Sequence, residues 1–209
     1  VVGESERLSR LLCEFIEFSG LRMGDRTDVN LPALIRDSVD LVRQHPDFDG
    51  GVAIECSGLD GELRVPGDED LLHRAVFNLV LNAVQFSGDG GRVGVHLKAC
   101  GPGENPRGTR IEDPVRLSIR DTGPGIEAEE VGRIFDPFFT TRSEGSGLGL
   151  AVVHRAVEAH HGAVFVDSPP SGGTEFVIYL PGSEARAEAE EPSESRAAAA
   201  RVSGTGRIP

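Results

Sequence analysis

The segment from Gly145 to Leu150 (Gly-Ser-Gly-Leu-Gly-Leu) has the composition of a phosphate-binding loop. It opens a predicted helix, so it offers unpaired backbone N–H groups and the positive end of the helix dipole, which favours phosphate by about 0.3–1 kcal/mol. It is not the dinucleotide fingerprint, because its last glycine is spaced differently and no strand precedes it. It is not a Walker loop either, because no Lys-Ser/Thr pair follows.

A second candidate is the segment Asp121-Thr122-Gly123-Pro124-Gly125, placed where a predicted strand ends. Its glycines would let a planar ligand approach the main chain closely, and its fixed carboxylate can accept a hydrogen bond from an exocyclic amine. A plain turn is the competing interpretation, because glycine and proline are common in turns.

Three carboxamide side chains form a third candidate. Asn78 and Asn82 are four residues apart and Gln85 follows three residues later, so all three project from one face of a predicted helix, beside its apolar stripe. That position corresponds to the rim of a cleft. On the two asparagines alone, a helix surface is the simpler interpretation, but asparagine is unfavourable inside helices, so the pair indicates a function.

An aromatic cluster precedes the glycine-rich run. Ile134, Phe135, Phe138 and Phe139 surround Pro137, and we interpret them as a hydrophobic plug into the core. With residues 140–147 beside it, the cluster is also typical of the anchor of a lid.

Helix and strand patterns alternate between Val29 and Leu180, which predicts an α/β two-layer domain of roughly five strands and three to four helices. Asn30 and Asp68 are predicted caps of the first two helices. The predicted helices cover residues 31–42, 69–86 and 148–161. The predicted strands lie at residues 52–56, 63–65, 93–97, 115–119, 163–167 and 174–180, with a loop at 101–114.

Both ends of the chain differ from this domain. Residues 1–20 predict one amphipathic helix with an apolar stripe that needs a partner, either the domain itself or a second copy. Residues 182–209 are rich in Ala, Glu and Arg and predict a disordered tail. We therefore expect an incomplete helical hairpin at 1–24, a domain at 28–181 and a tail at 182–209.

The composition excludes several classes of protein. Its 21 basic and 34 acidic residues give a net charge of −13, which opposes nucleic-acid binding. No apolar run reaches the roughly 18 residues of a membrane helix, and we expect no signal peptide. Cys13, Cys56 and Cys100 are predicted reduced thiols of a cytosolic protein. The first residue is Val1, so we expect a fragment of a longer chain.

In their order and context these segments resemble the catalytic and ATP-binding domain of sensor histidine kinases, within the family shared with DNA gyrase, mismatch-repair ATPases and a heat-shock chaperone. The resemblance covers about residues 5–181 and is strongest to the nitrogen-regulator-like branch, whose second hairpin helix residues 5–20 resemble. The matching motifs are the asparagine box (78–83), the first glycine box (121–125), the phenylalanine box (134–141), the second glycine box (145–150) and the closing strand motif (173–176).

The resemblance implies a Bergerat-type α/β (α+β) sandwich: a mixed, mostly antiparallel sheet of about five strands with three helices on one face, preceded by one hairpin helix. It also implies ATP and Mg²⁺ as ligands. Asn82 would ligate the metal through its amide oxygen with help from Asn78, since Mg²⁺ prefers hard oxygen ligands. Asp121 would accept the adenine amine, and Phe86 would lie against the adenine ring.

The catalytic residues implied are Asn78 and Asn82, and the implied metal ligand is Asn82. Backbone amides of the second glycine box would hold the triphosphate. The full set implied for nucleotide binding is Asn78, Asn82, Gln85, Phe86, Asp121, Gly123, Gly125, Ile126, Thr140, Thr141, Arg142, Gly145, Ser146, Gly147, Leu148, Gly149 and Thr174. In this set Leu148 is expected to act as a core anchor, like Leu150.

The sequence departs from the family in three ways. Hydrolytic members carry a glutamate where Asn78 stands, and a neutral amide cannot deprotonate water, which favours phosphoryl transfer over hydrolysis. Many kinases carry a lysine at the position of Gln85. The phosphoacceptor motif, a histidine followed by Glu or Asp and then Asn-Pro, is absent. The six histidines, His45, His73, His96, His154, His160 and His161, are predicted to be surface or helix-end residues.

The implied function is transfer of the ATP γ-phosphate to a histidine on a hairpin helix before Val1, for relay to a response-regulator aspartate. The implied partners are ATP, a receiver domain and a second copy through the hairpin, with no nucleic acid and no membrane contact by this fragment. Cytoplasmic localisation is expected, while a membrane anchor in the preceding part stays open. Two alternatives remain: a serine kinase of the same fold, and a non-catalytic nucleotide-sensing module.

Overall fold

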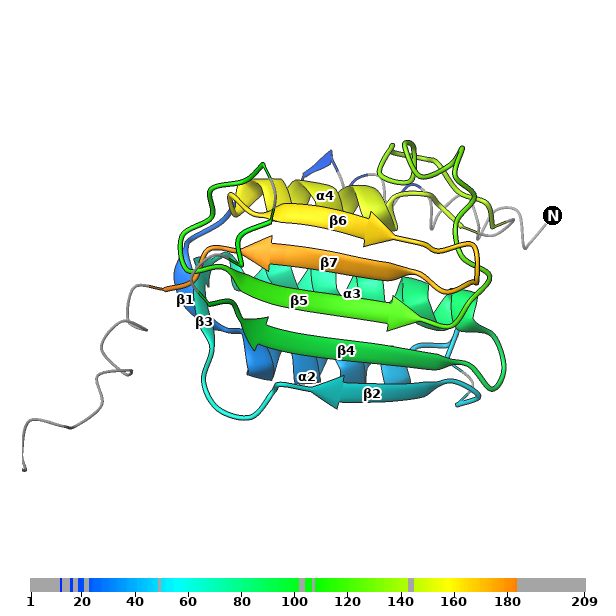
Figure 1. The fold of residues 1–209 in the computed structure, drawn as a ribbon, viewed down its shortest axis with the longest axis horizontal. Helices are drawn as coiled ribbons and strands as arrows, with labels where there is room; N and C mark the ends of the chain where they lie inside the picture. The colour runs from blue at the N-terminus through cyan, green and yellow to red at the C-terminus, as the bar shows by residue number, and fades with distance from the viewer. Residues whose placement is uncertain are drawn as a thin grey trace, which may run out of the picture.

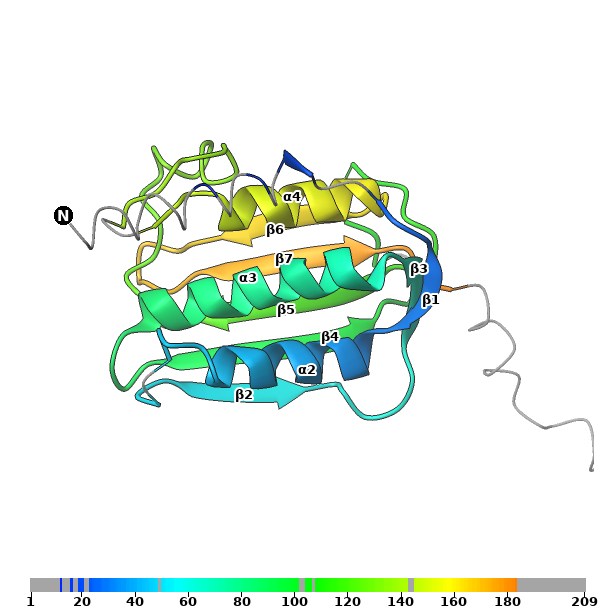
Figure 2. The same cartoon turned by 180° about the vertical axis from the view of Figure 1, so that it is seen from behind.

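The computed structural model describes residues 23–48, 50–101, 104–106, 108–142 and 145–183, together with residues 12, 16, 19 and 20. In this part of the chain a sheet forms one layer and three helices cover one of its faces (Figures 1 and 2). The elements are β1 (Thr27–Asn30), α2 (Leu31–Arg43), β2 (Ala53–Ser57), β3 (Arg64–Gly67), α3 (Glu69–Ser87), β4 (Arg92–Ala99), β5 (Val115–Asp121), α4 (Gly149–Ala159), β6 (Ala163–Asp167) and β7 (Glu175–Leu180).

The main sheet has the strand order β2-β4-β5-β7-β6. Only the β2–β4 pair is parallel, and the other three pairs are antiparallel. The predicted mixed, mostly antiparallel sheet with helices on one face is therefore confirmed. Of the predicted hairpin helix at 1–20 only residues 12, 16, 19 and 20 are described, and of the predicted tail only residues 182 and 183, so both remain predictions.

The helices begin where the sequence predicts. The Asn30 side chain accepts a hydrogen bond from the Ala33 N–H at the start of α2. The Asp68 side chain accepts one from the Leu71 N–H at the start of α3. Both caps satisfy backbone donors that have no partner within the helix. None of the helices in the described part of the chain combines the length and hydrophobicity that a membrane span requires.

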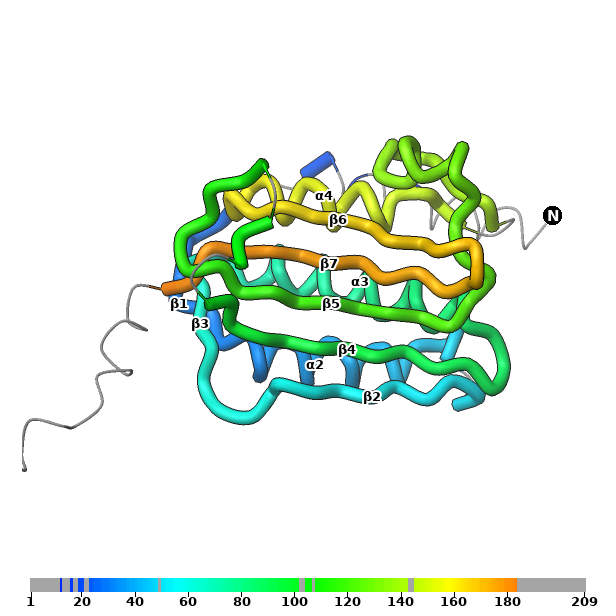
Figure 3. The backbone as a smooth tube through the Cα atoms, in the orientation of Figure 1, coloured from blue at the N-terminus to red at the C-terminus, as the bar shows by residue number. Residues whose placement is uncertain are grey.

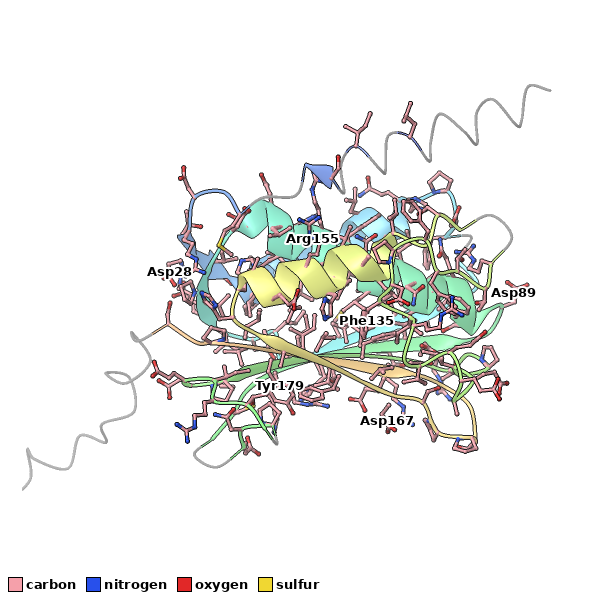
Figure 4. The ribbon with its side chains drawn as sticks, turned by 90° about the horizontal axis from the view of Figure 1, so that it is seen from above. Asp28, Asp89, Phe135, Arg155, Asp167 and Tyr179 are labelled. Carbon is pink, nitrogen blue, oxygen red and sulfur yellow. The ribbon has the colours of Figure 1, made fainter. Side chains whose placement is uncertain are left out.

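The core lies between the helices and the inner face of the sheet. Alternate strand residues such as Val95, Leu117 and Phe176 point into it and are almost fully buried. The opposite face of the sheet carries Tyr179 and Asp167, which point away from the helices in Figure 4. This alternation follows from the two-residue period of a strand.

Strand β1 was not predicted from the sequence. Its four residues contain only one apolar side chain, Val29, and a strand of this length has no recognisable alternation. It forms because β3, more than 30 residues further along, pairs with it antiparallel, with Val29 opposite Val65. The two buried valines attach this short pair to the core.

The domain has two functionally different ends. At one end lie the last turns of α2 and α3, the end of β5 and the start of α4, with the long β5–α4 connection folded beside them (Figure 3). At the other end lie β1, β3 and the last turn of α4. The candidate ligand residues all belong to the first end.

His160 connects elements at the second end. It is a helix-end residue, as predicted, but it is buried, with 2% of its surface exposed. Its Nδ1 lies 2.7 Å from the carbonyl oxygen of Ala156, and its Nε2 accepts a 2.9 Å hydrogen bond from the Asp68 N–H. The ring is therefore neutral, with its proton on Nδ1. The Asp68 carboxylate in turn accepts from the Gly24 N–H at 2.6 Å, so His160 and Asp68 tie the start of α3 to the segment before β1.

Acid should destabilise the domain through His160. Burial lowers the pKa of His160 below its usual value of about 6.5, so the unfolded state binds a proton more readily than the folded state. The free energy of unfolding should fall as the pH falls below that usual value. We expect His160→Gln to lose this part of the pH dependence in urea unfolding between pH 8 and pH 5. The control His96→Gln, on an exposed strand residue, should keep it, and an unchanged pH profile in His160→Gln would contradict the assignment.

Candidate functional site

A cleft of about 620 Å³ opens at the first end of the domain. It is lined by all the residues predicted for nucleotide binding except Gly123. The predicted residues that line it are Asn78, Asn82, Gln85, Phe86, Asp121, Gly125, Ile126, Thr140, Thr141, Arg142, Gly145, Ser146, Gly147, Leu148, Gly149 and Thr174. Four segments far apart in the sequence thus converge on one concave surface of ordinary ligand-site size.

Asp121 lies at the inner part of this cleft and is 4% exposed. Its Oδ1 accepts hydrogen bonds from the Gly123 N–H at 2.8 Å and from the Thr174 N–H at 3.2 Å. Burial raises the pKa of the Asp121 carboxyl above its usual value, although the two N–H donors act in the opposite direction. Within the described chain Oδ2 accepts no hydrogen bond, so it is the oxygen available to a ligand amine.

Gly123 supports the cleft without lining it. A Cβ on Gly123 would lie 2.5 Å from the carbonyl oxygen of Phe86, so only glycine allows the loop to approach the end of α3 so closely. The Gly123 carbonyl accepts a 2.7 Å hydrogen bond from the Gly173 N–H. The Ser168 hydroxyl accepts from the Ile126 N–H at 2.7 Å and donates to the Gly173 carbonyl at 3.2 Å. These bonds fix the first glycine box against the β6–β7 turn.

The second glycine box brings the start of α4 to the asparagine pair. A Cβ on Gly149 would lie 3.4 Å from Asn78 Oδ1, so the helix start and the carboxamide are direct neighbours. Gly147 has a φ of +70°, and a Cβ there would lie 2.4 Å from the backbone of Phe138. Among the described residues no side chain caps the start of α4, so its first N–H groups face the cleft without a capping partner. Leu148 is buried, as expected for a core anchor.

The aromatic cluster is divided between the core and the surface. Ile134 is buried, and Phe135 lies between α4 and the sheet, against His154 and Phe176 (Figure 4). Phe139 lines the cleft, with the Arg133 guanidinium 4.8 Å from its ring centre. Phe138, however, is 57% exposed, so the prediction that it belongs to a buried plug is wrong. Its backbone turns outward, with a φ of +69°, and its N–H donates to the Gly147 carbonyl.

The sequence did not reveal the part of the cleft formed by the end of α2. Leu41, His45 and Asp47 line it, and Gln85 Nε2 donates a 2.6 Å hydrogen bond to Asp47 Oδ2. No motif surrounds these residues, so no local signal could have identified them. The other lining residues that were not predicted are His73, Arg74, Phe77, Leu81, Glu130, Ile134, Phe139, Leu150, Val152 and Phe176.

The donor set in the cleft fits Mg²⁺ that arrives with a polyphosphate. The carboxamides of Asn78 and Asn82 offer hard oxygen ligands, and no group of three or more His, Cys, Asp or Glu side chains in the described residues could form a metal cage of its own. Mg²⁺ commonly takes few protein ligands and completes its octahedron with water and phosphate oxygens.

Comparison with known proteins identifies the class. The profile of the family described as histidine kinase-, DNA gyrase B-, and HSP90-like ATPases matches residues 67–184. The chain belongs to this family.

Sensor histidine kinase ZraS of Escherichia coli K12 is 35% identical over 178 residues, which are 85% of this chain and 36% of that protein. Signal transduction histidine-protein kinase AtoS of the same organism is 32% identical over 185 residues, which are 87% of this chain and 28% of that protein. This chain therefore spans only about a third of the length of these curated relatives. It carries the ATP-binding catalytic domain of a sensor histidine kinase, as the resemblance implied.

Solved structures agree with this assignment. The mycobacterial sensor histidine kinase MprB superposes with a TM-score of 0.63 at 35% identity, over 75% of this chain and 97% of that chain. Full-length ShkA, solved in complex with AMPPNP, superposes with a TM-score of 0.66 at 28% identity, over 86% of this chain and 37% of that chain.

Proposed function

We propose that this domain binds Mg·ATP in the cleft and transfers the γ-phosphate to a histidine on the dimerisation hairpin of the full-length protein. The phosphate would then pass to an aspartate of a response-regulator receiver domain. The observation that carries the proposal is the convergence of the four motifs on one cleft, with the buried Asp121 at its inner part and the start of α4 beside Asn78.

The proposed binding mode follows from the donors and acceptors of the cleft. Asp121 Oδ2 would accept the adenine amine, and Phe86 would lie against the base. The free N–H groups at the start of α4, with Thr140 and Thr141, would hold the phosphates. Asn82 would ligate Mg²⁺ with help from Asn78, and the bound metal would neutralise phosphate charge. Gly123 would act through the loop rather than by contact.

Phosphoryl transfer, rather than hydrolysis, is favoured by the residue at position 78. The hydrolytic members of the family have a glutamate there, which can take a proton from water, whereas the Asn78 carboxamide cannot. The remaining requirement for transfer is to hold the acceptor and the phosphate in line, which is largely a matter of position and charge. The hairpin would supply the acceptor, and a second copy of the chain would complete the dimer. ATP and reduced thiols favour a cytoplasmic site of action.

The test is phosphotransfer between separate molecules. This chain, with γ-labelled ATP and Mg²⁺, should label a hairpin dimer that bears the acceptor histidine, and the label should be lost in acid, because phosphohistidine hydrolyses there. A hairpin with His→Gln at the acceptor is the control. The chain alone should neither label itself nor release phosphate appreciably. Acid-stable label on a partner would favour a serine kinase, and intact ATP binding with no label anywhere would favour a nucleotide-sensing module.

A further inference from the structure

The carboxylate of Asp47 lines the cleft and belongs to no motif. Asp47 stands in the short segment between α2 and β2, and its side chain is 43% exposed. Its Oδ2 accepts the 2.6 Å hydrogen bond from Gln85 Nε2 and lies 3.9 Å from Arg142 Nη2. Its backbone N–H donates to His45 Nδ1 at 3.2 Å, which helps to fix the turn. Two segments distant in sequence, α3 and the β5–α4 connection, therefore contact this carboxylate at the cleft.

In the proposed binding mode, Asp47 lies on the side of the cleft that would hold the phosphates. Gln85 lies one turn of α3 beyond Asn82, and Arg142 follows Thr140 and Thr141, which line the same surface as the second glycine box. A negative charge here repels a polyphosphate. It also pairs with the arginine that a phosphate would otherwise attract. Both effects act against an anionic ligand, and neither acts on an uncharged one.

We propose that Asp47 sets the nucleotide affinity of this site by competing with the nucleotide phosphates for Arg142, with Gln85 holding the carboxylate in position. This inference rests on the proposed function, because it concerns the same cleft. Arg142 is paired with Asp47, and a bound triphosphate would have to displace that pairing. The consequence is weaker binding of both substrate and product, and therefore faster release of the nucleotide after transfer.

The phosphate-dependent part of the affinity is the quantity to measure. Asp47→Asn removes the charge of the side chain and keeps its shape. Asp47→Ser also removes the charge, but with a smaller side chain. Asp40→Asn is the matched control, because Asp40 is an exposed carboxylate on α2 that pairs with Arg43 and does not line the cleft. Calorimetry with Mg·ATP, Mg·ADP and adenosine separates phosphate effects from base effects. Thermal unfolding of each variant confirms that it folds.

Both Asp47 variants should bind Mg·ATP about two- to fivefold more tightly than the unmutated chain, the range expected for one partly exposed ion pair. The gain should be smaller for Mg·ADP, absent for adenosine and reduced by high salt. Asp40→Asn should change nothing. In an Arg142→Ala background the gain from Asp47→Asn should shrink, because the pairing is already lost.

Equal or weaker Mg·ATP binding in the Asp47 variants would overturn the inference. So would an equal gain for adenosine, which would indicate a general change of the cleft, or an undiminished gain in the Arg142→Ala background. If the unmutated chain does not bind Mg·ATP, the proposed function fails and this inference fails with it. If it binds and Asp47→Asn has no effect, only this inference fails.

Discussion

Asp121→Asn should weaken Mg·ATP binding by about 10- to 150-fold, which corresponds to the roughly 1.5–3 kcal/mol of a hydrogen bond to a charged group. Asparagine can keep the Oδ1 bonds to the N–H groups of Gly123 and Thr174, but its Nδ2 donates where the adenine amine needs an acceptor. Titration calorimetry of the 209-residue chain with Mg·ATP measures the loss.

The same variant should lose selectivity for the base. Guanine has a carbonyl where adenine has its amine, so the asparagine N–H₂ group gains a partner with GTP, and the preference for ATP over GTP should shrink. Asp89→Asn, an exposed carboxylate beyond the end of α3 (Figure 4), is the matched control. Equal competition by ATP and GTP in the unmutated chain would exclude Asp121 as the adenine acceptor.

The protonation of Asp121 adds a pH signature to this prediction. Because burial raises its pKa, Asp121 takes up a proton at a higher pH than an exposed aspartate does. ATP affinity should therefore begin to fall at a correspondingly higher pH, and Asp121→Asn should lack this dependence. The free energy of unfolding of the Asp121→Asn variant should not fall through loss of the charge, because burial makes the ionised form of Asp121 unfavourable in the folded state.

Asn82→Ala should abolish most of the benefit that Mg²⁺ gives to ATP binding. Removal of a group that merely supports a metal ligand commonly costs about 10- to 100-fold in metal affinity, and we expect at least this loss when a direct ligand is removed. In the unmutated chain ATP should bind better with Mg²⁺ than with a chelator present, whereas in Asn82→Ala the two affinities should converge. Phosphotransfer to the hairpin should fall in parallel.

Two further variants make this result specific. Asn82→Asp keeps an oxygen ligand and should retain the dependence on Mg²⁺, while Gln44→Ala removes an exposed carboxamide outside the cleft and should behave like the unmutated chain. An unchanged Mg²⁺ dependence in Asn82→Ala would show that the metal is held elsewhere.

Local patterns in the sequence determined most of the fold. Helices α2 and α3 were predicted from the periodicity of their apolar residues and from their caps, Asn30 and Asp68, because both signals lie within a few neighbouring residues. The long strands β4 and β5 were predicted from their alternation. The family and 16 of the 29 residues that line the cleft followed from the spacing and order of four motifs, because a loop that must approach a ligand or another backbone closely requires glycine.

Only the tertiary structure decided the contacts between residues that are distant in sequence and stand in no pattern. Asp47 and Gln85 are 38 residues apart, and His160 and Asp68 are 92 apart, yet each pair is joined by a hydrogen bond. Strand β1 exists because β3 pairs with it. Phe138 is exposed because the backbone hydrogen bond to Gly147 turns it outward, although its hydrophobicity predicted burial. The type of a residue determines which interactions its side chain can form, whereas packing across the whole chain determines which partners it contacts.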